Sequence, residues 1–353
     1  MTLRRVQVTD FRCLHQAEID LDPQFTLISG PNASGKTSLL EAIYVLGRGR
    51  SFRTRRLHHL IRSGCERLMV TGEVESPARI RLGIEGSKAG MRAKIAGVWA
   101  SSLAELATAL PVQIIDPEVH RLIEEGPSRR RRFLDWGVFH VEPNFVAHWQ
   151  NYHQALKQRN AALKARQPRT IVSAWDGDLI RYGDLLTEAR LRYLGQLMIE
   201  GKGLSQALLS MELGIGYRVG WDANLTLREA LDRSWASDLE FGSTQVGPQR
   251  AELTLRLDGL PVKDRISRGQ QKLLAAALLI AQLKLFPRHS PVRPTLLLDD
   301  PAAELDSERL AEFIHEIRAQ AVQLVVTTLH AEFSAFGIPG HRLKLDRGIV
   351  STH

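Results

Sequence analysis

The stretch of the chain that decides its fold reads Gly30-Pro31-Asn32-Ala33-Ser34-Gly35-Lys36-Thr37. These eight residues match G-x-x-x-x-G-K-[ST], the phosphate-binding P-loop. The apolar run at 25–29 before them is typical of a buried strand, and the segment after them places Leu39, Leu40 and Ile43 on one face of a helix. A strand, a glycine-rich loop and a helix in this order favour a nucleoside triphosphate site over a chance glycine-rich turn.

The residue types in this loop explain how it would bind phosphate. Gly30 and Gly35 let the backbone approach an anion closely, and the following helix points its free N–H groups at the anion. We expect Lys36 to reach the β- and γ-phosphates and the Thr37 hydroxyl to ligate Mg²⁺. The sequence therefore predicts that residues 30–37 bind ATP together with magnesium.

Size and composition set the frame for the rest of the chain. Its 353 residues suit two domains or one domain with a large insertion, and an apolar content of 44% is enough for a hydrophobic core. The formal charge of +8 favours a polyanionic partner. Nucleic acid, an acidic membrane surface and simple solubility all fit this charge, so the charge alone does not choose among them.

Cysteine content and apolar runs predict a cytoplasmic protein. Cys13 and Cys65 are the only cysteines, and they form no C-x-x-C pair, which favours a reduced chain. The N-terminal residues show no apolar signal-peptide core, and the longest apolar run, at 273–281, is too short to span a bilayer. We therefore expect no membrane partner.

Hydrophobic periodicity divides the chain into three parts. Strand patterns mark residues 1–115, with an alternating antiparallel meander over 68–95, and helical periodicity marks 116–238. Strand patterns return in 239–353, around an apolar helix at 273–285 and a second helix at 306–318. These patterns predict an α/β ATPase lobe made of 1–115 and 239–353, with a helical lobe inserted at 116–238. No heptad pattern persists long enough for a long coiled coil, and the aromatic stripe of the helical lobe is predicted to be core.

Two acidic residues follow a buried strand and complete the chemistry that a P-loop needs. The apolar run 296–298 ends at Asp299 and Asp300. Asp299 suits the magnesium shell, and Asp300 suits the polarisation of the attacking water. We therefore expect Thr37 and Asp299 to hold the metal and Asp300 to act in hydrolysis.

A second anion site is predicted at the start of the apolar helix. Ser267 and Gly269 precede this helix, whose N-terminus favours an anion. One chain does not need two γ-phosphate sites, but a head-to-tail dimer does, if each subunit's Ser267 and Gly269 close over its partner's P-loop. The alternative is an ordinary helix capped by Ser267.

These motifs, in this order, resemble those of ABC-type ATPase heads of the structural-maintenance-of-chromosomes kind and, more narrowly, those of the RecF family. The resemblance covers nearly the whole chain. Its most specific parts are Pro117-Glu118, residues 126–135, residues 298–300 with Glu304-Leu305-Asp306, Ser51-Phe52-Arg53 and residues 267–271.

The resemblance implies an ABC-type ATPase head that dimerises on ATP and acts in recombinational gap repair, replication restart and the SOS response to DNA damage. It implies binding to single-stranded DNA and gapped duplex DNA, cooperation with RecO and RecR, and assistance to RecA loading. The implied ATPase is weak and DNA-stimulated, and it serves as a dimerisation switch. Asp300 stands where many ABC ATPases have the longer Glu, which also predicts slow hydrolysis.

The chain departs from the family pattern at several positions. Gln249 stands where the family usually has His, and Glu125 stands where it has Gly. His330 lies slightly later than the switch histidine of ABC ATPases, and Gln113 is a candidate for a magnesium-linked glutamine. Both are carried as additional candidates for the ATP site.

Three basic groups are candidates for contact with DNA phosphates. They are Arg129 to Arg132, the loop 48–62, and a group around the helical break made of Lys157, Arg159, Lys164, Arg166 and Arg169. Each group could instead be a solvated face, and Arg130 or Arg131 could brace one lobe against the other.

Two other functions stay open at this point. An ATP-binding subunit of an ABC transporter shares the P-loop and the S-x-G-Q turn, but it normally carries Asp-Glu at the strand end. A DNA-independent switch protein would use ATP-driven dimerisation only to display a protein surface. A small GTPase is not favoured, because the chain contains no Asn-Lys-x-Asp guanine motif.

Overall fold

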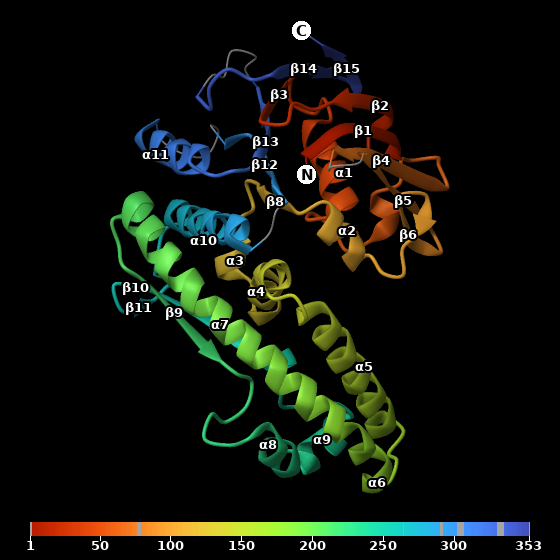
Figure 1. Cartoon of the computed structure of the whole chain (residues 1–353), viewed down its shortest axis with the longest axis vertical. Helices are drawn as coiled ribbons and strands as arrows, with labels where there is room; N and C mark the ends of the chain where they lie inside the picture. Colours follow the sequence, from red (N-terminus) through yellow and green to blue (C-terminus); the bar gives the residue numbers. More distant parts are fainter. Residues whose placement is uncertain are drawn as a thin grey trace. The chain divides into compact units, whose positions relative to one another are not determined.

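The computed structural model describes residues 2–75, 79–263, 265–289, 292–301, 307–329 and 335–352 (Figure 1). The chain divides into two compact units. The first unit consists of Met1–Val119 and Phe286–His353, and the second unit consists of His120–Leu285. In the part of the chain just defined, no helix is long and apolar enough to cross a membrane.

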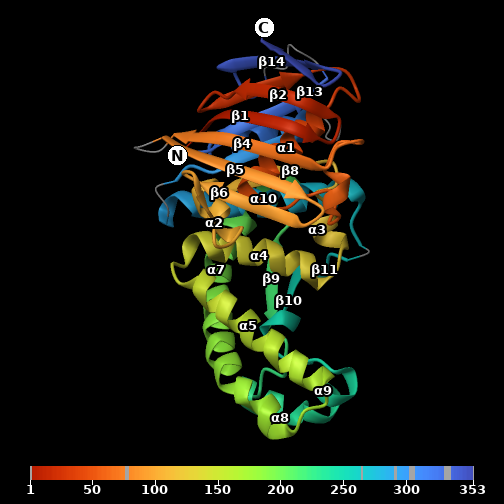
Figure 2. The same ribbon diagram turned by 90° about the vertical axis from the view of Figure 1, so that its right-hand side faces the viewer.

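An antiparallel sheet forms one layer of the first unit. Its strand order is β2-β1-β4-β5-β6-β7 (Figure 2). The strands are β1 (Thr2–Phe11), β2 (Leu14–Asp20), β4 (Arg67–Glu75), β5 (Arg79–Ser87), β6 (Gly90–Ile95) and β7 (Val98–Trp99). Buried and accessible residues alternate along β4 and β5, as expected of a sheet with one face on the core and one in solvent. The predicted meander is therefore present, extended by β1 and β2.

A mostly parallel sheet forms the other layer of the first unit, in the order β15-β14-β3-β13-β12-β8. Its strands are β3 (Phe25–Ser29), β8 (Val112–Ile115), β12 (Thr295–Asp299), β13 (Gln323–Thr328), β14 (His341–Asp346) and β15 (Ile349–Thr352). Strands β3, β12 and β13 are buried along their whole length, as expected of parallel strands covered on both faces. Parallel pairing brings the ends of β3, β12 and β13 to one edge.

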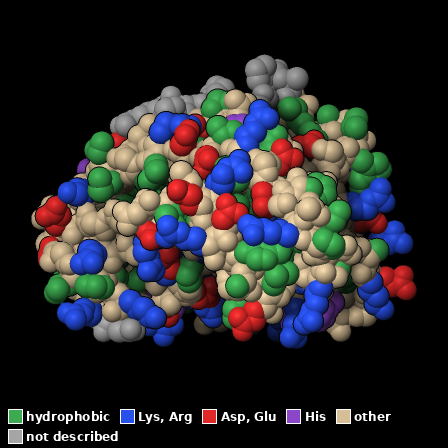
Figure 3. Space-filling view, turned by 90° about the horizontal axis from the view of Figure 1, so that it is seen from below, with side chains coloured by type: hydrophobic (Ala, Val, Ile, Leu, Met, Phe, Trp, Pro, Cys, Tyr) green, Lys and Arg blue, Asp and Glu red, His purple; other side chains and the backbone are tan. Residues whose placement is uncertain are grey.

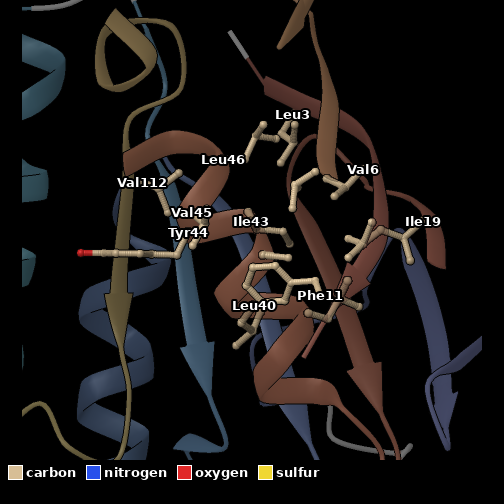
Figure 4. Packing of buried hydrophobic residues seen from close by; sticks show 14 of the residues in the cluster. Leu3, Val6, Phe11, Ile19, Leu40, Ile43, Tyr44, Val45, Leu46 and Val112 are labelled. Carbon is tan, nitrogen blue, oxygen red and sulfur yellow. The ribbon is translucent and has the colours of Figure 1, made fainter. Parts of the chain in front are cut away.

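Helix α1 (Lys36–Arg48) lies between the two sheets, and eleven of its thirteen residues are buried. Figure 4 shows Leu40 and Ile43 of α1 beside Phe11 and Val6 of β1, with Tyr44 on the side of Val112 in β8. A helix this enclosed cannot shift without opening both layers, so its N-terminus is held firmly. The remaining short elements of the unit are η1 (Leu57–His59), α2 (Ala104–Ala109) and α11 (Ser307–Arg318).

Helices and one small sheet make up the second unit. Its longest helices are α4 (Pro127–Val141), α5 (Phe145–Lys164), α7 (Asp176–Leu209) and α10 (Arg268–His289), whose last residues are counted with the first unit. The shorter helices are α3 (Arg121–Glu124), α6 (Arg169–Val172), η2 (Ser173–Trp175), α8 (Leu227–Arg233), α9 (Trp235–Phe241) and η3 (Pro248–Arg250). The sheet consists of β9 (Leu213–Arg218), β10 (Glu252–Leu257) and β11 (Leu260–Pro261).

The second unit begins at His120 and runs to Leu285, past the end of the insertion predicted at 116–238, and it includes β10, β11 and most of α10. The second unit extends past Asp238 because of β9, a strand within 116–238 that the helical periodicity of this segment did not predict. Residues 252–257 of β10 pair antiparallel with 213–218 of β9, which ties the segment after Asp238 to the helices before it.

The aromatic stripe of the inserted helices is core only in part. Tyr152 and Tyr193 are both 1% exposed, and Leu163 is fully buried. Trp175 and Tyr182 are half-buried, and Trp149 is 37% exposed. Its ring stacks on His153 with 3.7 Å between ring centroids.

A buried charge cluster joins three elements of the second unit. The Arg159 side chain of α5 is 1% exposed and donates to Asp176 and Asp238, each at 2.7 Å. It also donates to the Thr244 hydroxyl at 2.8 Å. Arg159 is thereby removed from the candidates for DNA contact, because its guanidinium is enclosed by protein.

Replacing Arg159 with Met should lower the free energy of unfolding of the second unit by about 3–5 kcal/mol, since it leaves Asp238 buried without its cation. Urea denaturation followed by circular dichroism measures the change. Lys157→Met is the matched control on the same helix, and because Lys157 is exposed it should leave the transition nearly unchanged. Equal stability of the two variants would contradict the structural role of the cluster.

Candidate nucleotide-binding site

The loop between β3 and α1 takes a conformation that its glycines make possible. A Cβ atom on Gly30 would lie 2.1 Å from the Leu345 carbonyl oxygen of β14. Gly35 caps α1 with φ +107°, in the left-handed region. The Gly348 N–H, in the turn between β14 and β15, donates to the Ser34 carbonyl at 2.9 Å. The C-terminal hairpin therefore supports the loop from outside.

Lys36 lies across the loop as its only cationic side chain. Its Nζ donates to the carbonyl oxygens of Gly30 at 2.7 Å and Pro31 at 2.9 Å. Burial lowers the pKa of Lys36, and the nearby carboxylates of Asp300 and Asp299 oppose that shift. The ammonium group is thus positioned on the loop, where an incoming phosphate oxygen would compete for it.

Asp299 is held by two threonines at the end of β12. The Thr37 hydroxyl donates to Asp299 Oδ2 at 2.9 Å, and the Thr327 hydroxyl of β13 lies 2.7 Å from Oδ1. A hydroxyl and a carboxylate side by side are hard oxygen ligands of the kind that Mg²⁺ prefers. Among the described residues, no group of three or more His, Cys, Asp or Glu side chains could hold a metal.

Asp300 directly follows the strand in an unusual backbone conformation. Its φ is +48°, which a non-glycine residue adopts at some cost, and its N–H donates to the Thr327 carbonyl at 3.2 Å. The turn places Asp300 on the wall of the same pocket as Lys36. Strain at this position is consistent with a functional residue.

A pocket of about 340 Å³ lies over the loop. Its lining belongs entirely to the first unit and consists of Cys13, residues 32–38, Arg53, Pro117, Asp299 and Asp300. The structure therefore brings the predicted P-loop residues together with both predicted carboxylates. Gly30 and Pro31 contribute through their carbonyls, which hold Lys36.

One organising residue of the site was missed by sequence reasoning. Glu41, in α1, is 0% exposed and pairs with Arg12 through two bonds of 2.9 and 2.8 Å. Arg53 lies 3.5 Å from the same carboxylate. Glu41 thus ties the segment after β1 and the segment after α1 to the P-loop helix. The available signal was a single acid within the apolar run 39–46.

Ser267 and Gly269 lie in the second unit, at the start of α10. The Ser267 hydroxyl accepts from the Gln270 N–H at 3.2 Å, and the Gln270 side chain accepts from the Ser267 N–H at 3.0 Å. This reciprocal pair is a capping box. Ser267 and Gly269 are both exposed, so the cap leaves them open to solvent. Capping by Ser267 is therefore present, and exposure leaves the turn available to a second chain.

The candidate residues for DNA contact differ in whether their side chains are paired within the protein or exposed to solvent. Arg130 forms two bonds with Glu252, at 2.9 and 3.1 Å, and Arg131 donates to the Ala251 carbonyl at 2.6 Å. Both side chains thus brace α4 against β10 and the residue before it, within the second unit. The exposed members of the third group are Lys157, Lys164, Arg166 and Arg169. Arg169 donates to the Asp232 carboxylate at 2.8 Å. Figure 3, seen from below, shows Lys and Arg side chains spread among acidic and hydrophobic ones.

The two additional candidates for the ATP site are Gln113 and His330, of which the structure describes only Gln113. Gln113 is 6% exposed and pairs with Leu296, three residues before Asp299, and it is not among the described residues that line the pocket. His330 and Glu304-Leu305-Asp306 lie outside the described residues.

Comparisons with known proteins agree with this geometry. The family model described as "RecF/RecN/SMC N terminal domain" matches residues 2–338. The "DNA replication and repair protein RecF" of Yersinia enterocolitica is 38% identical over 99% of this chain and 98% of that protein. A solved RecF-ATP structure, titled as a recombination mediator of the RecFOR pathway, is 27% identical and matches 100% of this chain and 97% of its own with a TM-score of 0.90. The Smc head domain of Pyrococcus furiosus shares the fold, with a TM-score of 0.59 at 15% identity over 100% of this chain and 96% of its own. These likenesses confirm the predicted fold class.

Lys36→Met should abolish the binding of a fluorescent ATP analogue, because it removes the only side-chain cation of the loop, and the circular dichroism spectrum should stay unchanged. Lys344→Met, on the exposed face of β14, is the control and should bind like the wild type. Wild-type affinity in the Lys36→Met protein would show that the site is wrongly assigned.

Proposed function

This chain belongs to the RecF family, and from that premise we propose that it is an ATP-dependent DNA-binding protein of recombinational gap repair and replication restart. The observation that carries the proposal is a pocket in which Lys36, Thr37, Asp299 and Asp300 converge, in a chain 38% identical to a relative over nearly its whole length. An ATP-binding subunit of a transporter is not favoured, since the relatives are named as DNA replication and repair proteins.

In this proposal residues 30–37 bind the phosphates of ATP. The N–H groups at the start of α1 face the anion, and Lys36 exchanges its carbonyl partners for β- and γ-phosphate oxygens. The Ser34 hydroxyl supports this, because it is 3% exposed and lacks a hydrogen-bond partner in the described structure. A bound phosphate would supply that partner. Thr37 and Asp299 would hold Mg²⁺, which neutralises phosphate charge.

Asp300 is the proposed general base that orients and polarises the attacking water. Aspartate is one methylene shorter than the glutamate of many ABC ATPases, which would hold the carboxylate on the order of 1 Å farther from the water. A misplacement of that size can cost ~10²-fold in rate. The ATP-bound state would therefore persist, and hydrolysis would act as a slow switch.

ATP would join two copies of the chain into a head-to-tail dimer. Ser267 and Gly269 are exposed at the N-terminus of a helix of 22 residues, where backbone N–H groups favour an anion. In the dimer they would contact the γ-phosphate held by the partner subunit. Two ATP molecules would then be enclosed between the two copies.

The proposed partners follow from the family. The solved relatives are titled as members of the RecFOR pathway, so RecO and RecR are the proposed protein partners, with assistance to RecA loading as the outcome. Single-stranded and gapped duplex DNA are the proposed nucleic-acid partners, and the cytoplasm is the proposed compartment. The net charge of +8 suits a polyanion of this kind.

Binding to gapped DNA with and without ATP tests the function and the dimer together. Ser267→Arg places bulk and charge where the partner's γ-phosphate should dock, so it should keep ATP binding but lose both the ATP-dependent dimer in light scattering and the ATP-dependent gel shift of gapped DNA. Ser267→Thr keeps the capping hydroxyl and should behave like the wild type. Failure of the wild type to bind gapped DNA in ATP would reject the function, and an unchanged dimer in Ser267→Arg would reject the two-site arrangement.

Asp300→Asn should retain ATP binding and dimerisation, because Asp299 and Thr37 are untouched, while turnover falls about 10²-fold or more through loss of the base. Single-turnover hydrolysis is the measurement. Asp300→Glu, which keeps the carboxylate, is the control and should hydrolyse at least as fast as the wild type. An Asn variant as fast as the wild type would remove Asp300 from the mechanism.

A further inference from the structure

A hairpin at the edge of the antiparallel sheet presents an aromatic ring among cations. Strands β6 and β7 are joined by Ala96 and Gly97, whose φ angles of +50° and +83° are typical of a type I′ turn. In the resulting register Trp99 of β7 lies opposite Lys94 of β6. Directly opposed residues project to the same face of a sheet, so Trp99 and Lys94 share the solvent face of the hairpin.

The Trp99 ring is close to two cationic groups. The Arg92 guanidinium lies 3.9 Å and the Lys94 ammonium 4.4 Å from the ring centroid. Trp99 is nevertheless 43% exposed, so solvent reaches a large part of the indole. Cation–π contacts at this distance hold the ring against the sheet while they leave both charges in water.

The surrounding strands carry an excess of positive charge. The segment 79–99 contains one acid, Glu85, and five exposed cations, which are Arg79, Arg81, Lys88, Arg92 and Lys94. Glu85 is the cross-strand partner of Arg92 in the register of β5 and β6, and its carboxylate lies 3.6 Å from Arg67 of β4. Within the described ranges, Arg92 and Lys94 have no carboxylate within 4.0 Å. Their charge is therefore available to an external anion.

We propose that the solvent face of β5, β6 and β7 binds single-stranded DNA, with one base stacked on Trp99 and adjacent phosphates on Arg92 and Lys94. This inference rests on the proposed function and names a surface for its DNA partner. None of the three basic groups considered from the sequence includes this hairpin.

The chemistry of the surface favours single strands over duplex. Stacking on a side chain requires a base whose face is free, which a continuous duplex does not offer. An aromatic ring flanked by cations matches the combination of stacking and phosphate contact that proteins use for single strands of any sequence. A protein partner would instead call for an apolar patch, whereas the residues of β6 that share the face of Trp99, Arg92 and Lys94, are charged. Val98, at 71% exposed, alternates with Trp99 and projects to the other face of the hairpin.

Variants of this face should fold, because the hairpin packs through its other side. Ala93, between Arg92 and Lys94, is 4% exposed and belongs to the hydrophobic core. The ATP pocket has no lining residue in β5, β6 or β7. Unchanged binding of an ATP analogue and an unchanged circular dichroism spectrum therefore verify that each variant is intact.

The experiment measures fluorescence anisotropy of labelled oligo-dT in the presence of ATP. Trp99→Ala should weaken binding about 5- to 150-fold, the range that corresponds to ~1–3 kcal/mol per stacked base, and Trp99→Phe should recover most of the affinity. Trp149→Ala is the matched control, since Trp149 is also partly exposed but stacks on His153 instead of facing cations. It should bind like the wild type. In the wild type, oligo-dT should also quench tryptophan emission, and Trp99→Phe should lose that quenching.

A salt titration tests the cations separately. Arg92→Gln should lower the log–log salt slope by about 0.7, the value for one phosphate contact on a single strand. Arg5→Gln is the control on the same sheet, because Arg5 is already paired with Asp20 at 2.7 Å.

Wild-type affinity for oligo-dT in both Trp99→Ala and Arg92→Gln would overturn the proposal, and so would an equal loss in Trp149→Ala. An equal loss of continuous-duplex binding in Trp99→Ala would overturn the stacking role. If the wild type binds gapped DNA in ATP and the hairpin variants match it, only this surface is wrong. If the wild type does not bind gapped DNA, the proposed function itself is wrong.

Discussion

The enclosure of α1 between two sheets is the constraint on which the first unit depends. The helix packs on β1, β4 and β5 on one side and on β8, β12 and β13 on the other. Because almost every residue of α1 is buried, its position is determined by both layers at once. The N-terminus of this helix is the phosphate-binding end, so the same packing that forms the core also positions Lys36 and Thr37. The packing that stabilises the first unit therefore also sets the geometry of the phosphate-binding loop.

Helix α1 also carries a buried charge, Glu41, which hydrophobic packing alone would not require. Glu41 is buried in α1 because Arg12 and Arg53 reach it from two separate segments, and removal of either arginine would leave a carboxylate in the core without its full compensation. Arg12 and Arg53 thereby connect the antiparallel sheet and the basic loop to the pocket. The second unit uses the same device at Arg159, which joins Asp176 and Asp238. In both cases a buried ion pair links segments distant in the sequence.

The two sheets of the first unit differ in structure, and the two proposed binding sites lie on different sheets. One sheet has a buried parallel arrangement whose strand ends hold Asp299 and Asp300, and the other has a free solvent face that ends at Trp99. Nucleotide chemistry is assigned to the former and contact with single-stranded DNA to the latter. The inner sides of both sheets pack on α1, so the two activities would share one rigid element without sharing residues.

The sequence by itself determined the parts of this protein whose signals are local. The P-loop at 30–37, the strands at 25–29, 112–115 and 323–326, and the acids at 299 and 300 could be predicted, because strand, loop and helix patterns each occupy a short continuous segment. The tertiary structure alone decided which charges are free. Arg159 and Arg130 look like solvent-facing cations in the sequence, but contacts made across 79 and 122 positions bury or pair them. It also decided that β10 pairs with β9, which enlarged the second unit, and that Thr327 holds Asp299. Each of these depends on residues far apart in the chain, and no short pattern encodes which distant partner a side chain will meet.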